Sequence, residues 1–277
     1  MIPFYGLLLF IISALFGRVD NTLERGHNDN NNLLLGNPSN AVQNLANKTN
    51  YLMNKPAFSL SYNSKKSIPN WVSWHLDEND FGAAKRTNSF RSDVDLPSSW
   101  FMATTSSYKN SGFDRGHNCP SADRTSSTEL NSSTFLMTNI IPQAPNNNQG
   151  VWVNLEEYSR SLVREGKELY IIMGAYGQGG SGSKGFMQSI DHGRIAVPSR
   201  LWKVILVLKR GNDDLTRINK NTEVIAVDVP NTNTVHSDWR KYVTIIDKIE
   251  RETGLDLLNN LSVETQQILE SKENKGN

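Results

Sequence analysis

The stretch Asp114-Arg115-Gly116-His117-Asn118-Cys119-Pro120-Ser121-Ala122-Asp123-Arg124 decides how this chain is interpreted. Hydrolysis of a phosphodiester needs a base that deprotonates water and positive charge near the non-bridging oxygens. His117 has a reference pKa of about 6.5, which suits a base near neutral pH. Arg115 presents a planar fork that matches phosphate geometry, and Gly116 lets the backbone turn sharply or approach a substrate closely. The segment therefore predicts a phosphodiester-cleaving site with His117 as general base.

A second, similar string limits what the four residues 114–117 prove by themselves. Glu24-Arg25-Gly26-His27 nearly repeats them inside a polar segment. That segment has no apolar strand or helix pattern to hold the histidine rigidly, and a catalytic base must be positioned. We interpret this copy as a chance occurrence, so the prediction depends on the residues that follow His117.

The spacing of apolar residues predicts the fold class. Three segments rich in Ile and Val are typical of strands, at residues 168–175, 201–208 and 224–229. Apolar residues recur at helical spacing from Val151 to Leu162 and from Trp239 to Ile249. Strands and helices do not alternate regularly as in a βαβ protein. We therefore expect an α+β fold with a mainly antiparallel central sheet and flanking helices.

Beyond the motif, the chain resembles the DNA/RNA non-specific endonuclease family of the His-Me finger (ββα-metal) superfamily. That family includes cyanobacterial and Serratia-type sugar-non-specific nucleases and the endonuclease G group. The similar stretches cover most of residues 62–261 and include 86–91, 121–125, 134–143, 146–148 and 152–156. The resemblance implies a ββα-metal active-site motif and a metal-dependent enzyme that cleaves both DNA and RNA to 5′-phosphate ends.

The resemblance also implies a metal ligand. Asn148 is the implied protein ligand of a divalent cation, Mg²⁺ first, with Mn²⁺ or another divalent ion as the alternative. Mg²⁺ suits such a site because it prefers oxygen ligands and keeps several of its waters. Counting without gaps from His117 selects Asn148 within the run Asn146-Asn147-Asn148. A shift by one residue is the main alternative.

Four more residues complete the expected site. Glu156 is implied to hydrogen-bond a metal-bound water, and Asp114 is expected to orient neighbouring groups without touching the metal. Arg86 matches the arginine that stabilises charge on the pentacovalent transition state, and Arg160 is implied to help neutralise the phosphate. With Arg115, these two arginines are the expected substrate-binding residues. Spacing alone would make Glu156 and Arg160 a surface ion pair of about 0.3–0.5 kcal/mol.

Four segments are predicted along the 277 residues. An apolar run at 2–16 has the length of a signal-peptide core and is short for a membrane span of roughly 20 residues. It predicts a signal peptide or N-terminal anchor at 1–18, followed by an Asn-rich flexible linker at 19–54. The nuclease domain is expected at 55–262 and a charged tail at 263–277. Secretion or periplasmic export is favoured, and organelle import or membrane anchoring is the alternative.

Composition bounds the partners and the kind of site. The formal net charge is +1, so an anionic substrate must meet local basic residues rather than a generally basic surface. Cys119 is the only cysteine, which excludes an intrachain disulfide and a thiolate metal cage. We interpret Cys119 as a packing residue, and Trp71 and Trp74 as core residues rather than base-stacking ones.

Two other functional classes stay open from the sequence. One is a catalytically inactive nucleic-acid-binding protein, against which the intact His117, Asn148, Glu156 and Arg115 argue. The other is a phosphodiesterase that acts on small phosphodiesters, for which the base and the metal would look the same. DNA and RNA are the expected partners, and an inhibitor protein is a further one.

Overall fold

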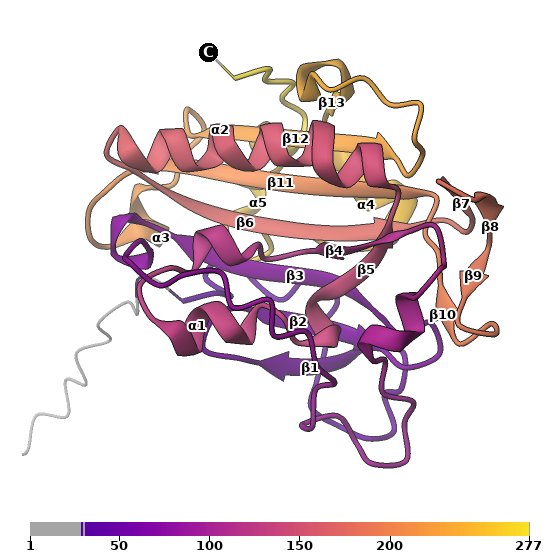
Figure 1. Cartoon of the computed structure of the whole chain (residues 1–277). Coiled ribbons are helices and arrows are strands. Elements are labelled where there is room, and N and C mark those ends of the chain that lie inside the picture. Colours follow the sequence, from indigo (N-terminus) through magenta and orange to yellow (C-terminus); the bar gives the residue numbers. More distant parts are fainter. Residues whose placement is uncertain (1–28, 30, 277) are drawn as a thin grey trace, which may run out of the picture.

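The computed structural model describes residue 29 and residues 31–276 of the chain. Its centre is a seven-stranded sheet in which every neighbouring pair of strands is antiparallel (Figure 1). The strands lie in the order β1 (Tyr51–Asn54), β2 (Ser59–Asn63), β3 (Ile68–Leu76), β6 (Lys167–Tyr176), β11 (Arg200–Lys209), β12 (Glu223–Pro230) and β13 (Val243–Thr244). The predicted α+β fold with a mainly antiparallel sheet is confirmed.

Both faces of the sheet are covered. Helix α2 (Val153–Arg164) lies in front of it in Figure 1, and α4 (Ile246–Thr253) and α5 (Val263–Glu270) lie behind it. Because side chains alternate along a strand, Trp74 packs in the core on one face and Trp71 in the core on the other. Both indoles are fully buried, which confirms their assignment to the core.

The active-site motif is built from two short strands and the helix after them. β4 (Asp114–His117) pairs antiparallel with β5 (Ile140–Gln143), and the chain continues through a π-helical turn (Asn147–Trp152) into α2. Buried Asn139 fixes the exit of β4, because its side chain accepts from the Cys119 amide at 3.0 Å and donates to the Cys119 carbonyl at 2.8 Å. This strand, strand and helix arrangement is the predicted ββα motif.

The N-terminal segment differs from the predicted flexible linker. Residues 31–54 pack against the sheet, with Leu34 and Leu35 buried and β1 forming its edge strand. Asn side chains close the turns of this segment, as Asn37 does with both backbone groups of Ala41. An Asn-rich composition therefore marks a series of side-chain-capped turns here. The predicted leader and the motif copy at 24–27 lie outside the described residues.

The C-terminal region differs from the sequence expectation in two places. The predicted tail contains α5, whose Leu269 is buried. The helix expected from Trp239 to Ile249 is divided into a 3₁₀ turn (Trp239–Tyr242), β13 and α4. Residues of β13 pair with Val227 and Ala226 of β12, so an edge of the sheet captures a stretch whose apolar spacing is typical of a helix.

The remaining elements are short connections. They are 3₁₀ turns at Glu78–Asp80, Thr105–Tyr108, Ser121–Asp123 and Met137–Asn139, helices α1 (Thr128–Ser133) and α3 (Asp214–Arg217), and strands β7 (Gly180–Gly182), β8 (Gly185–Met187), β9 (Ser189–Ile190) and β10 (Ile195–Ala196). Within residues 31–276, no helix has the length and apolar character needed to cross a membrane.

Candidate active site

Gly116 is required by packing inside the motif. Its neighbour across the two-stranded ladder is Ile141, and a Cβ at this position would lie 2.2 Å from Oε1 of Gln143. That separation is far below van der Waals contact, so any larger residue would displace Gln143 or the strand. The close approach expected of Gly116 is therefore made to Gln143. It keeps β4 and β5 in register between Asp114 and His117.

His117 ends β4 in a mostly buried position. Its side chain is 9% exposed, and its Nε2 has no hydrogen-bond partner among the described residues. The ring packs edge-on against Phe135 at 4.9 Å and lies 5.3 Å from the ring of Phe90. Burial, followed by the charges of Arg86 and Arg115, lowers the pKa of His117 to about 3. The imidazole is thus neutral at pH 7, the form that accepts a proton.

The buried imidazole predicts a pH dependence of stability. Below its usual pKa the unfolded chain protonates His117 while the folded chain does not. The free energy of unfolding therefore falls as the pH is lowered from about 6.5 towards about 3. We expect a smaller fall in His117→Asn, which has no proton to gain. Urea unfolding of both proteins across this window measures the difference. Equal pH slopes in the two proteins would contradict the prediction.

A cavity of about 630 Å³ lies beside the motif. Four of the expected site residues line it: Arg86, Asp114, Arg115 and Asn148. Residues of the turn Thr105–Tyr108 and Lys109 also line it. The cavity therefore combines three basic side chains with one carboxylate and three amides, a lining suited to an anionic substrate.

Both arginines that line the cavity are held on aromatic rings. The guanidinium of Arg115 lies 4.1 Å from the centre of the Phe90 ring, and that of Arg86 lies 4.9 Å from the Phe135 ring. Arg86 also donates to Ser121 Oγ at 2.7 Å. Cation–π contacts and a side-chain hydrogen bond restrict where the two charges sit. The rings that flank His117 thus also position positive charge around it.

The side chains in the turn just before α2 offer oxygen donors that suit a hard divalent cation. Asp114 Oδ2 accepts from Asn148 Nδ2 at 2.9 Å and from Gln149 Nε2 at 2.8 Å. This contact occupies the nitrogen of the Asn148 amide and leaves its oxygen for a ligand. Mg²⁺ is commonly bound by one or two protein oxygens with waters around it. Asp114 thus holds the side-chain amides of Asn148 and Gln149 in fixed orientations.

The other two residues of the Asn run are engaged elsewhere. Asn147 is fully buried, accepts from Gln143 Nε2 at 2.8 Å and donates to the Pro230 carbonyl at 2.6 Å. The Asn146 side chain donates to the backbone of Asn233. Because both polar atoms of Asn147 already have protein partners, the geometry favours Asn148 as the ligand over its neighbour in the run.

Glu156 lies in a buried group of charges on the first turns of α2. Its carboxylate is 3.9 Å from Lys203 Nζ and 4.0 Å from Arg160 NH1. Burial, only partly offset by Lys203, raises the pKa of Glu156 to about 6. Arg160 is 5% exposed and does not line the cavity, because it donates to Asp123 at 2.9 Å and Glu157 at 2.8 Å. The structure pairs Arg160 with these carboxylates outside the cavity lining, although the resemblance implies that it helps to neutralise the phosphate.

Lys203 and Asp123 belong to this group but were not expected from the sequence. Lys203 is 1% exposed, and its ammonium lies 4.9 Å from the Trp152 ring and 5.5 Å from the Trp74 ring. The available signal was a lysine within the apolar run 201–208, where a charge on a buried strand needs a partner. That partner could not be identified from the sequence, because Glu156 approaches Lys203 only through the packing of α2 on the sheet.

Replacing Asp123 is expected to lower the free energy of unfolding substantially. It accepts from Arg160 and, at 3.1 Å, from Trp74 Nε1. Asp123→Ala removes the counter-ion of buried cations, so we expect a loss of about 3–5 kcal/mol in the free energy of unfolding. Asp95→Ala is the control, because Asp95 also forms an ion pair, with Lys55, yet is 70% exposed; it should cost less than about 1 kcal/mol. Similar losses in urea titrations of the two variants would contradict the prediction.

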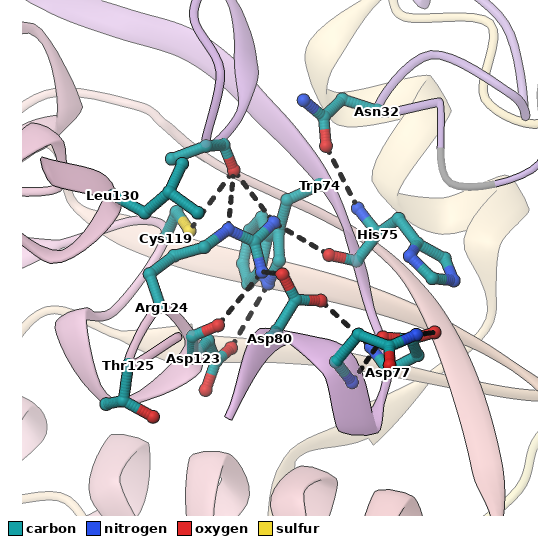
Figure 2. Close-up of polar contacts among 12 residues, drawn as sticks. Asn32, Trp74, His75, Asp77, Asp80, Cys119, Asp123, Arg124, Thr125 and Leu130 are labelled. Carbon is teal, nitrogen blue, oxygen red and sulfur yellow. Dashed lines mark hydrogen bonds and ion pairs between the residues drawn. The ribbon is translucent and has the colours of Figure 1, made fainter. Parts of the chain in front are cut away.

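Arg124 fastens the segment after the motif to the central sheet. Figure 2 shows its guanidinium reaching the backbone carbonyl of His75 and the carboxylate of Asp80. It also donates twice to the carbonyl of Ala57. Beside it, buried Asn131 donates to the carbonyls of Ser121 and Arg124 and accepts from the Thr87 amide. These bonds connect the segment that carries Arg86 to the one that follows His117.

Comparison with known sequences identifies the protein class. The family model for the DNA/RNA non-specific endonucleases matches residues 35–264. A curated nuclease of Nostoc sp. is 47% identical over 240 residues, which cover 87% of this chain and 85% of that protein. The mitochondrial nuclease EXOG of Xenopus laevis is 33% identical over 71% of this chain, which spans 55% of the length of that relative.

A solved structure gives independent support for the fold. The crystal structure of the EndoG/EndoGI complex matches with a TM-score of 0.67 and 20% sequence identity, over 84% of this chain and 92% of that one. The chain contains the ββα motif beside a cavity, and the family model matches most of its length. This chain therefore belongs to the DNA/RNA non-specific endonuclease family and is a nuclease.

Proposed function

We propose that this nuclease is a sugar-non-specific endonuclease that hydrolyses phosphodiester bonds of DNA and RNA, with His117 as its general base. The observation that carries this proposal is the position of the His117 imidazole, which is held between two aromatic rings and whose Nε2 has no hydrogen-bond partner among the described residues. It lies in the field of Arg86 and Arg115, both of which line the cavity. A base surrounded by phosphate-binding charge suits attack of water on phosphorus.

In this mechanism His117 Nε2 takes a proton from the attacking water and holds it while the 3′ oxygen departs opposite. The products then carry 5′-phosphates. Arg115 and Arg86 bind the non-bridging oxygens, and Arg86 gains most as charge accumulates on the pentacovalent phosphorus. Arg160 adds positive charge from its position beside Glu156. None of these contacts uses the 2′ hydroxyl, which accounts for cleavage of both DNA and RNA.

The implied cofactor is a divalent cation, Mg²⁺ first and Mn²⁺ or another divalent ion as the alternative. When bound, such an ion supplies Lewis-acid stabilisation of the phosphate and the leaving oxygen. Asn148 Oδ1 would hold it directly, Glu156 would hydrogen-bond its waters, and Asp114 keeps the Asn148 amide in the orientation required. This arrangement uses only oxygen donors, which agrees with the preference of Mg²⁺.

The experiment that tests this function follows plasmid DNA and a structured RNA over a series of Mg²⁺ and Mn²⁺ concentrations, with EDTA as the control. We expect cleavage of both polymers, abolished by EDTA, with ends that a ligase accepts without prior phosphorylation. Binding of the polymers without cleavage would instead identify an inactive binding protein. Hydrolysis of a bis-aryl phosphate without a cut polymer would identify a small-molecule phosphodiesterase.

The cellular setting is a separate proposal. We propose that residues 1–18 direct the protein to export or secretion, with import into an organelle and membrane anchoring as the alternatives. The compared crystal structure is titled as a complex of EndoG with EndoGI and a mechanism of EndoG inhibition. By analogy, we propose an inhibitor protein as a further partner of this chain.

A further inference from the structure

The C-terminal helices carry a group of acidic side chains far along the chain from the active site. Asp247 and Glu250 come from α4 and Glu270 ends α5, behind the sheet in Figure 1. One carboxylate oxygen from each of the three lies within 4.8 Å of the others. Oxygens on opposite sides of a Ca²⁺ ion are separated by about 4.6–5.2 Å, since its bonds are 2.3–2.6 Å long. The three oxygens therefore fit within one calcium coordination sphere.

Glu270 contributes a buried carboxylate oxygen that has no hydrogen-bond partner among the described residues. This oxygen is Oε1, and the side chain is 7% exposed. A buried carboxylate oxygen without a partner is costly. Glu270 also ends α5, where the helix dipole is negative and a further anion is unfavourable. A cation would offset both effects.

The described residues form no ion pair with these three acids, Asp247, Glu250 and Glu270. Burial, and then the like charges of Glu250, Asp247 and Asp256, raise the pKa of Glu270 to about 8. Glu250 has one favourable contact, the Leu257 amide at 2.6 Å.

We propose that Asp247, Glu250 and Glu270 form a second, structural divalent-cation site that binds Ca²⁺ in preference to Mg²⁺ and joins α4 to α5. Carboxylate oxygens are hard donors that suit either ion. Three carboxylates around one point favour Ca²⁺, because Ca²⁺ accepts many oxygen ligands in flexible geometry, whereas Mg²⁺ requires near-ideal octahedral geometry and usually takes only one or two carboxylates. The family match ends at residue 264, so the site includes a residue beyond the matched region.

Bound calcium would stabilise the core on the rear face of the sheet. Ile249 of α4 and Leu269 of α5 are buried in one cluster with Leu34 and Leu35 of the N-terminal segment. An ion that bridges the two helices holds this cluster closed. It acts on the folded state only, so its free energy of binding adds to that of folding.

Thermal unfolding with and without calcium tests the site, in the Asn148→Ala background so that the catalytic site contributes no binding. The melting temperature should rise by roughly 5–10 °C when Ca²⁺ exceeds its Kd about 100-fold, and by less in Mg²⁺. Glu270→Gln should lose this shift. Glu264→Gln, which removes an exposed carboxylate of the same helix, should keep it.

A second variant and a direct binding measurement complete the test. Asp247→Asn changes an exposed residue and should fold normally, with calcium affinity reduced at least about tenfold. Isothermal titration of the Asn148→Ala protein should give one calcium per chain, and none after the further change Glu270→Gln. A protein without calcium-dependent stabilisation, or one whose shift survives Glu270→Gln, would overturn the proposal.

Discussion

Replacing His117 by Ala is expected to lower the rate of plasmid cleavage by roughly 10³-fold at neutral pH and saturating Mg²⁺. A positioned general base contributes about 10²–10⁴-fold to such reactions. His117 Nε2 has no partner among the described residues, and the ring is fixed between Phe90 and Phe135. Affinity for DNA should change little, because phosphate is bound by the arginines. Single-turnover cleavage and filter binding separate the two effects.

Two controls sharpen this experiment. His192→Ala removes an exposed histidine and should retain wild-type cleavage. Imidazole added to His117→Ala should restore part of the rate if a proton acceptor is what was lost. Undiminished cleavage by His117→Ala, measured in Mg²⁺ on the same plasmid, would eliminate His117 as the base.

Replacing Asn148 by Ala in the otherwise wild-type protein is also expected to have a large effect. We expect the rate of cleavage of plasmid and RNA to fall by roughly 10³-fold. A divalent ion supplies several kcal/mol of charge stabilisation in phosphoryl chemistry, and each 1.36 kcal/mol corresponds to about tenfold in rate. The Asn148 amide oxygen is the protein atom proposed to hold that ion. Direct binding of Mn²⁺, followed by its paramagnetic resonance signal, should weaken in parallel.

Variants of the two preceding asparagines show which residue of the run 146–148 binds the metal. Asn146→Ala changes an exposed side chain bonded to Asn233 and should leave Mn²⁺ binding intact. Asn147→Ala breaks buried bonds to Gln143 and Pro230, so it should lower the melting temperature. Wild-type Mn²⁺ affinity in Asn148→Ala, with loss of binding in Asn147→Ala, would move the ligand by one residue.

Several features of this protein are predictable from local sequence because local chemistry determines them. The apolar runs around Ile171, Val204 and Ala226 became neighbouring strands of the sheet. The ββα motif follows from residues 114–164, a contiguous stretch in which two strands pair and the helix comes directly after them. Cys119 is fully buried, as expected of a small apolar side chain with no role in hydrolysis.

Other features depend on contacts between distant segments and cannot be predicted from the sequence. Lys203 meets Glu156 only because α2 packs against the central sheet. Polar residues 31–50 seemed unstructured because their partners, such as Trp71 for Ser39, lie far along the chain. Arg160 matches the family pattern, yet the buried Asp123 and the adjacent Glu157 take its guanidinium.

The bonds of Asn131 have a consequence for how this protein can be produced. Asn131-Ser132-Ser133 fits the acceptor sequence for N-linked glycosylation, which attaches the sugar to the side-chain nitrogen. In the fold that nitrogen donates to the carbonyls of Ser121 and Arg124, and the residue is 1% exposed. A sugar added during synthesis in a eukaryotic secretory pathway would remove one of the two N–H donors and could not fit at this buried position. In such a host, the protein must bury Asn131 by folding before the residue is glycosylated. A bacterial host without N-linked glycosylation imposes no such competition.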